Sequence, residues 1–125
     1  MKKKHGPLHH RILVHLHRIL DRVRGKIPHG AKARSSLWYG VAKAFRARPG
    51  NNECACCPHK TTLNVHHIRP YHLHPELELE PTNFITLCRV CHLLLGHLDN
   101  WHSFNVGVQK DAAGIAHKIA TRPAG

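Results

Sequence analysis

CACC at residues 54–57 and CRVC at residues 88–91 are the two segments of this sequence that decide its fold. Each contains a C-x-x-C pair, which presents two sulfurs to one ion from a single tight turn. Two such pairs complete a tetrahedral zinc site, which can stabilise a small domain with few large apolar side chains. The fifth cysteine, Cys56, is predicted to be a free thiol, because C-x-C is a less usual turn. The predicted structural zinc ligands are Cys54, Cys57, Cys88 and Cys91.

Hydrophobic periodicity and helix breakers predict short helices and strands on both sides of the cysteine pairs. Apolar residues recur at three- and four-residue steps over about 8–24, which predicts an amphipathic helix that ends before Pro28. Ser35 or Ser36 can cap a second helix that runs to about residue 48. The other expected elements are strands at 63–65 and 84–87, a short helix within 91–98 and a weaker helix over 111–121.

The composition is strongly basic. The 125 residues include 19 Lys and Arg against 7 Asp and Glu, a formal net charge of +12 before any of the 15 histidines is protonated. Nucleic acid is the first candidate partner, because each basic side chain near a phosphate releases a counterion. A solvated basic surface or affinity for anionic lipid is the alternative. Arg11 and Arg18, on the polar face of the first helix, are candidate DNA contacts or solvated side chains.

The sequence argues against a membrane protein and against a secreted one. No apolar stretch approaches the roughly 20 residues that a membrane helix needs. Basic residues and histidines interrupt the first 20 residues, which disfavours a cleaved signal peptide. The cysteine spacing favours a metal site in a reducing compartment over disulfides. We therefore expect a cytoplasmic protein that has no membrane partner.

The segment between the two cysteine pairs contains VHHIRP at 65–70 and Asn83, and the second pair continues into His92. This arrangement resembles the HNH endonuclease family, and GHLDNWHSFN at 96–105 also looks like its bacterial and phage members. The resemblance implies a small α+β fold, the ββα-metal finger, in which two strands and a helix hold one divalent ion. Many members of the family add a four-cysteine zinc knuckle at this same place.

The resemblance also implies a division of the chain into three parts. It covers about residues 35–108, which we expect to form the HNH nuclease domain. Residues 1–34 are expected to be a basic amphipathic helical extension and linker. Residues 109–125 are expected to be a C-terminal tail with a short helix.

The family motif assigns roles to four residues of this chain. It makes His67 the general base, His66 and His92 ligands of the catalytic ion, and Asn83 the residue that orients the base. The chemistry agrees, because imidazole has a pKa suited to taking a proton from water near neutral pH. A divalent ion can stabilise the leaving 3′ oxygen as a Lewis acid. Two arginines beside the motif are candidate phosphate contacts or solvated side chains, namely Arg69 and Arg89.

A third ligand of the catalytic ion is a further candidate. Many family members have Asp where this chain has His66, and the His form resembles the nuclease colicins, which have another His four residues after the helix histidine. Here that position is Gly96, and His97 follows it. In a regular helix, residues five apart point roughly 140° away from each other. We therefore expect two side-chain ligands. His97 is a third ligand only if Gly96 weakens the helix enough for the chain to turn and bring this imidazole back toward the ion.

The expected function is that of a metal-dependent DNA endonuclease with a structural zinc ion and a catalytic Mg²⁺, Mn²⁺, Ni²⁺ or Zn²⁺. Double-stranded DNA is the expected partner, and no small-molecule cofactor is expected. Two alternatives stay open: a non-catalytic zinc-binding nucleic-acid module, and an HNH-type nuclease that acts on RNA. The joint presence of His67, Asn83 and His92 favours catalysis, because a pure binding module has no need of all three.

Two further expectations concern the surroundings of the motif. Glu76, Glu78 and Glu80 alternate with leucines, which indicates an extended edge whose acidic side chains face water. Trp101 and Phe104 are expected to pack the back of the finger, where a small domain needs aromatic area.

Overall fold

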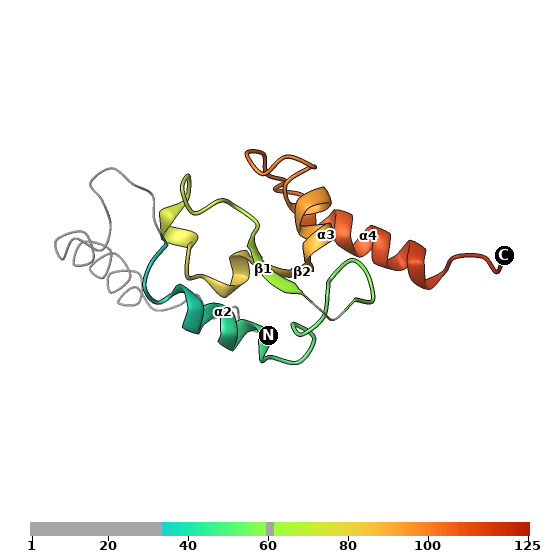
Figure 1. Cartoon of the computed structure of the whole chain (residues 1–125), viewed down its shortest axis with the longest axis horizontal. Coiled ribbons are helices and arrows are strands. Elements are labelled where there is room, and N and C mark those ends of the chain that lie inside the picture. Colours follow the sequence, from blue (N-terminus) through green and yellow to red (C-terminus); the bar gives the residue numbers. More distant parts are fainter. Residues whose placement is uncertain (1–33, 60–61) are drawn as a thin grey trace.

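The computed structural model describes residues 34–59 and 62–125, and it has a small α+β fold built around two antiparallel strands (Figure 1). In these residues we find no helix with the length and apolar character of a transmembrane span. The elements are helix α2 (Trp38–Arg46), strand β1 (Leu63–His67), 3-10 turns η1 (Pro75–Leu77) and η2 (Pro81–Asn83), strand β2 (Phe84–Cys88), helix α3 (Arg89–Cys91), the π-helical turn η3 (His92–Gly96) and helix α4 (Val108–Ala120).

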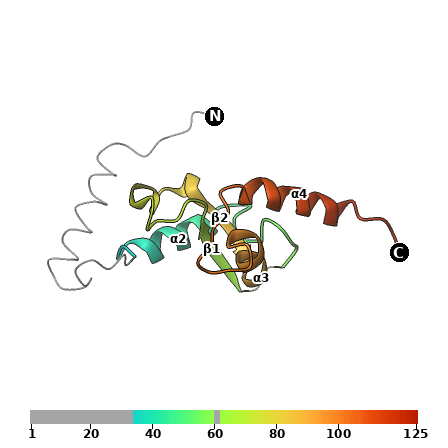
Figure 2. The same ribbon diagram turned by 90° about the horizontal axis from the view of Figure 1, so that it is seen from above.

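The two strands form the centre of the described structure. β1 pairs with β2 so that Leu63 lies opposite Cys88 and His67 lies opposite Phe84. Both views place this sheet between α2 on one side and the α3–α4 region on the other (Figures 1 and 2). β2 is buried along its whole length because helices cover both of its faces. The chain passes from β2 directly into α3 and η3, which completes the expected ββα order.

Alternate side chains of β2 pack into two separate apolar clusters. Phe84 meets the ring of Trp38 edge-on, with 5.3 Å between ring centroids, and the ring of Phe45 at 5.4 Å. Ile85 and Leu87 point to the other face, as the two-residue period of a strand requires. There they pack with the cysteines and with two fully buried residues at the start of α4, which are Val108 and Ala112.

Helix α4 packs into the core at its start, whereas residues 109–125 were expected to form a C-terminal tail. The proposed boundary at residue 108 falls at the first residue of α4, and Ala112 is completely buried in the cysteine cluster. The start of this helix therefore belongs to the core of the domain. Only the later turns of α4 are largely exposed.

The predicted strands are confirmed, and each extends one or two residues further than expected, to His67 and to Cys88. Helix α2 confirms the second predicted helix, although it begins at Trp38 rather than directly after the serines. The hydroxyl oxygen of Ser35 accepts the N–H of Leu37 at 3.2 Å, just before the helix. Helix α4 confirms the last predicted helix. The helix predicted over 8–24, with Arg11 and Arg18, lies outside the described residues.

The acidic segment is folded differently from the expectation. Residues 75–83 form two 3-10 turns rather than an extended edge, so the side chains do not alternate between water and core. Glu78 is completely buried and Glu80 is 7% exposed, whereas Glu76 is exposed. One carboxylate oxygen of Glu78 accepts the backbone N–H of Ser35 at 2.7 Å. The interpretation of all three acids as water-facing was wrong for Glu78 and Glu80.

Candidate metal centres and active site

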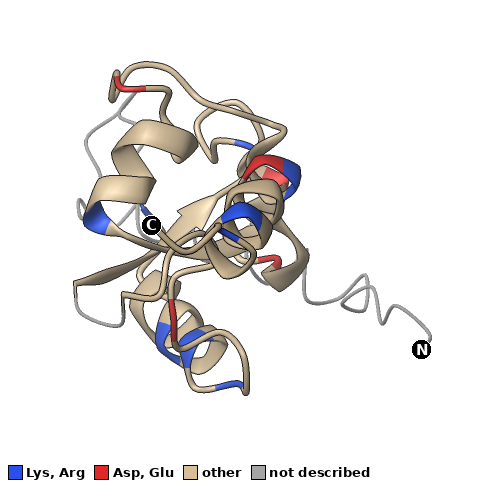
Figure 3. Cartoon of the chain, turned by 90° about the vertical axis from the view of Figure 1, so that its right-hand side faces the viewer, with Lys and Arg blue, Asp and Glu red and all other residues tan. Residues whose placement is uncertain are grey.

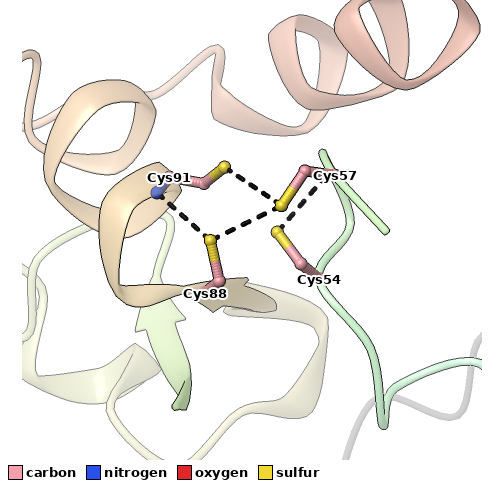
Figure 4. Close-up of side chains that lie close together, drawn as sticks. All are labelled: Cys54, Cys57, Cys88 and Cys91. Atoms are coloured by element: carbon pink, nitrogen blue, oxygen red, sulfur yellow. Dashed lines mark hydrogen bonds between the residues drawn. The ribbon is translucent and has the colours of Figure 1, made fainter. Parts of the chain in front are cut away.

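The four predicted zinc ligands converge on one point. Figure 4 shows their sulfurs pointing toward one another, two from the loop before β1 and two from the junction of β2 with α3. The ligand atoms of the four cysteines all lie within 4.8 Å of one another. The Cys57 sulfur is 3.5 Å from that of Cys88 and 3.7 Å from that of Cys91. Sulfurs about 2.3 Å from a tetrahedral zinc ion lie about 3.8 Å apart, so the quartet fits zinc.

The electrostatics of the cysteine quartet also favour a bound cation. Burial first, and then the neighbouring sulfurs, raise the pKa of the Cys91 thiol far above its usual range. At Cys54 burial opposes ionisation, but backbone N–H groups led by that of Cys57 outweigh it and lower the pKa to about 7. Four thiolates packed this closely repel one another unless a positive ion lies between them. Cys56 is buried in the same core and is not one of the four converging ligands.

A second cluster consists of His66 from β1 and of His92 and His97 from the two ends of η3. Their ring centroids are 4.9 to 5.0 Å apart, and one nitrogen of each lies within 4.8 Å of the others. His66 is only 3% exposed, and its Nε2 atom has no hydrogen-bond partner among the described residues. A buried imidazole nitrogen without a partner is costly unless it binds an ion. The three histidines therefore fit a divalent transition metal.

The π-helical turn is what brings His97 into this cluster. The N–H of His97 donates to the carbonyl of His92 at 3.1 Å, so the hydrogen-bonded turn closes after five residues instead of four. Residues five apart then share a face, and the Nε2 atoms of the two histidines are 3.2 Å apart. The expectation that His97 points away from His92 assumed a regular α-helix and was wrong.

Gly96 makes room for the His66 imidazole. A Cβ atom at this position would lie 3.1 to 3.2 Å from three atoms of that ring, which is closer than side chains normally pack. The sequence indicated only that Gly96 weakens the helix. It did not show that the absence of a side chain at this position also leaves space for the His66 ring. Because η3 approaches β1 this closely, the nitrogens of two different elements can face one site.

Replacing Gly96 with alanine is expected to weaken metal binding at the histidine cluster about 10- to 100-fold, the range seen when residues that support metal ligands are changed. The added methyl group would press on the His66 ring, which is buried and tightly surrounded. The ring must then shift, and its nitrogen moves away from those of His92 and His97. Calorimetric titration of Ni²⁺ into zinc-loaded protein measures this effect. Gly114→Ala is the matched control, because nothing lies within 4 Å of a Cβ there. Equal Ni²⁺ affinity of Gly96→Ala and the wild type would contradict the packing argument.

Hydrogen bonding sets the tautomer of His97. Its Nδ1 lies 2.7 Å from the carbonyl oxygen of Ser103, and a carbonyl can only accept, so Nδ1 carries the proton. The lone pair of His97 is therefore on Nε2, which faces His92. Such support of the second ring nitrogen is usual for histidines that bind metal ions.

The environment keeps His66 and His92 neutral, which is the form of imidazole that binds metals. Burial, followed by the neighbouring histidines, lowers the pKa of His66 to about 3. Burial, followed by the charges of His97 and Arg34, lowers the pKa of His92 to about 4. Both imidazoles are therefore unprotonated near neutral pH, and their lone pairs can bind a cation.

His67 lies next to this cluster but is held by different contacts. Its Nε2 is 2.8 Å from the backbone carbonyl of Glu78, so Nε2 donates and the basic lone pair is on Nδ1. Its ring stacks on the indole of Trp38, with 4.3 Å between centroids and 30° between planes. Both His66 and His67 line one pocket of about 460 Å³. The two adjacent histidines thus occupy different environments at a single site.

Comparison with known families agrees with this geometry. Residues 53–98 match the model of the HNH endonuclease family. This segment is an HNH domain. It contains the cysteine quartet, the strand pair, His66, His67, Asn83, His92 and His97. No curated protein and no solved structure matches the chain.

Asn83 of the HNH domain acts on the backbone rather than on the imidazole. Its side-chain oxygen accepts the N–H of Arg69 at 2.9 Å, and its amide nitrogen donates to the carbonyls of Arg69 and Leu77 at 3.0 and 3.4 Å. Asn83 therefore does not orient His67 by a direct hydrogen bond to its ring. Asn83 instead ties together the two ends of the loop that presents the Glu78 carbonyl to His67.

The pocket of the HNH domain also contains residues that sequence reasoning placed elsewhere. Trp101 is 54% exposed, and its ring lies 5.2 and 5.0 Å from those of His92 and His97. Phe104 is 37% exposed and lines the same pocket. The expectation that these two aromatic residues pack the back of the finger was wrong, because the loop after η3 turns toward the histidines.

Arg34 is a basic side chain of the histidine pocket that the sequence analysis did not identify as a site residue. It is the single Lys or Arg among the described residues that line the histidine pocket. Its guanidinium carbon lies 4.8 Å from the ring centroid of Trp38 and 5.2 Å from that of Tyr71. Arg69 does not line this pocket, and Arg89 lies beside the cysteine quartet instead. No motif distinguishes Arg34 from the other basic residues near it in the sequence.

The described part of the chain contains little of the total charge. Residues 1–33 and 60–61 contain ten of the nineteen Lys and Arg but one of the seven acids, so they contribute nine of the twelve net positive charges. Figure 3 shows the remaining Lys and Arg spread over several elements of the described structure. Within residues 34–59 and 62–125, Arg34 is the lining residue that brings a fixed positive charge to the pocket.

Proposed function

We propose that this chain is a metal-dependent DNA endonuclease, in which the HNH domain hydrolyses phosphodiester bonds with His67 as the general base. The observation that supports this most strongly is the joint lining of one pocket by His67 and by the three-histidine cluster. A base and a metal centre that face the same pocket can act on the same phosphate.

His67 is suited to take the proton from the attacking water. The Glu78 carbonyl holds the Nε2 proton, so Nδ1 is the basic nitrogen. Trp38 stacks on the ring and limits its rotation, which keeps the basic atom in one direction. Asn83 supports this arrangement from the loop behind Glu78 and is a positioning residue.

His66, His92 and His97 would hold the catalytic divalent ion, and that ion would stabilise negative charge on the leaving 3′ oxygen as a Lewis acid. An all-imidazole set suits Zn²⁺ and Ni²⁺ well, and Mg²⁺ and Mn²⁺ are the other candidates. Cys54, Cys57, Cys88 and Cys91 would bind a separate zinc ion that stabilises the fold.

Arg34 is the proposed contact to the scissile phosphate. Its guanidinium takes part in no hydrogen bond or ion pair among the described residues, and it lies over two aromatic rings at the pocket wall. A planar guanidinium can bind two phosphate oxygens at once. Arg69 and Arg89, which do not line the pocket, are proposed as further contacts along the nucleic acid. Arg11 and Arg18, which precede the described residues, are proposed as contacts too.

Incubation of zinc-loaded protein with supercoiled plasmid tests the proposal. Nicked or linear DNA should accumulate with Mg²⁺, Mn²⁺ or Ni²⁺ and not with EDTA, and activity should return when the ion is restored. Parallel reactions with single-stranded RNA separate a ribonuclease from a deoxyribonuclease. DNA binding without cleavage under all three ions would instead support a non-catalytic nucleic-acid module.

A further inference from the structure

Trp101 is a large aromatic side chain that packing does not explain. More than half of its surface is exposed, although it lies about 5 Å from two metal-binding histidines. The other tryptophan, Trp38, is 5% exposed and packs in an apolar cluster. An open indole at the rim of a polar pocket is suited to bind another flat apolar group.

The loop that carries Trp101 is held at both ends. The carbonyl of Ser103 accepts from His97 Nδ1, and the N–H of Ser103 donates to Asn100 at 2.8 Å. The N–H of Asn105 donates to Gly96 at 3.1 Å, and its side chain donates to the Leu95 carbonyl at 3.0 Å. These bonds fix the loop on η3, so Trp101 has a defined position before any ligand binds.

The same loop contains strained backbone. Leu98 and Asp99 have φ angles of 52° and 63°, in the left-handed region that residues other than glycine rarely adopt. Such conformations persist where the surrounding contacts require them, and they concentrate at functional sites. Here they turn the chain back over the pocket immediately before Trp101.

The chemistry around Trp101 matches one nucleotide. Arg34 and the histidines offer contacts for a phosphate, and Trp101 with Phe104 offers aromatic surface in the same pocket. Every nucleobase has a flat π-face, and stacking on aromatic side chains is how proteins bind single strands without sequence preference. In an intact duplex the bases stack on one another and are not open to such a contact.

We propose that Trp101 is a stacking platform for an unpaired nucleobase beside the phosphate at the histidine cluster. The site then favours single-stranded or locally unpaired DNA over intact duplex, in contrast to the double-stranded partner expected from the sequence. The inference rests on the proposed function only in placing nucleic acid at this pocket, because stacking does not require cleavage.

Fluorescence anisotropy with a labelled single strand of about 12 nucleotides, and with its duplex, tests the proposal. Full-length protein with one zinc ion per chain, enough for the cysteine quartet alone, is used without added divalent ion, so that the histidine cluster holds no catalytic ion and nothing is cleaved. Trp101→Ala should weaken single-strand binding about 5- to 150-fold, whereas Trp101→Phe should retain most of it. Duplex binding should change much less. Tyr39→Ala is the control, because Tyr39 is 79% exposed but lies on α2 outside the pocket.

A second measurement separates stacking from support of the metal centre. Trp101→Ala should bind Ni²⁺ as the wild type does, and the single strand should quench the fluorescence of the exposed indole. Equal loss of single-strand and duplex binding, an equal effect of Tyr39→Ala, or a parallel loss of Ni²⁺ binding would each overturn the inference. Cleavage without selective stacking would refute this inference alone, whereas stacking without cleavage would refute the nuclease proposal alone.

Discussion

Replacing His67 with glutamine is expected to lower the rate of DNA cleavage about 10²- to 10⁴-fold, because removal of a general base has effects of this size. Glutamine can still donate to the Glu78 carbonyl, but it has no nitrogen that can take a proton from water. Zinc content and DNA binding should stay near the wild-type values. The measurement is the initial rate of plasmid nicking with saturating Mn²⁺.

His67→Ala gives a complementary test. The ring is 7% exposed and stacks on Trp38, so the alanine variant should also lose some stability by leaving a cavity. Imidazole added to the solution can enter that cavity and should restore part of the activity of His67→Ala. His117→Ala, on the exposed side of α4, is the control for loss of a histidine. Wild-type cleavage by His67→Gln would show that another group is the base.

Cys88→Ser is expected to unfold the described domain. A structural zinc site can contribute on the order of 10 kcal/mol to folding, and this thiol lies at the junction of β2 and α3. The Cys88 sulfur also accepts the N–H of Cys91 at 3.5 Å, so it organises the turn as well as the ion. Zinc stoichiometry and thermal unfolding should both report the loss.

Cys56→Ser is the matched control for this prediction. Cys56 is as buried as Cys88 and packs in the same cluster, but it is outside the converging quartet. Its replacement should cost only the burial of a hydroxyl, about 1 to 3 kcal/mol, and should leave one structural zinc per chain. A Cys88→Ser protein with full zinc content and a cooperative melt would show that a different set of ligands binds the zinc.

Local spacing made the cysteine quartet and the strand pair predictable. A C-x-x-C pair converges within one turn whatever surrounds it, so Cys54 with Cys57 and Cys88 with Cys91 could be paired from the sequence. The strands were recognisable because their apolar runs are short and bounded by turn residues. The resemblance to the HNH family then implied that His66 and His92 bind one ion, and the two imidazoles do lie close together.

The sequence by itself therefore determined the order of the two strands and the following helix and the cysteine quartet, because each depends on spacing along the chain. The resemblance to the HNH family implied the pairing of His66 with His92. Only the tertiary structure decided that His97 joins them, since five residues cannot show whether a turn closes with α- or π-helical hydrogen bonds. It also decided that Arg34 and Trp101 face the pocket and that Asn83 ties the loop rather than the imidazole. These positions depend on contacts between residues far apart in the chain, and local residue patterns do not specify such contacts.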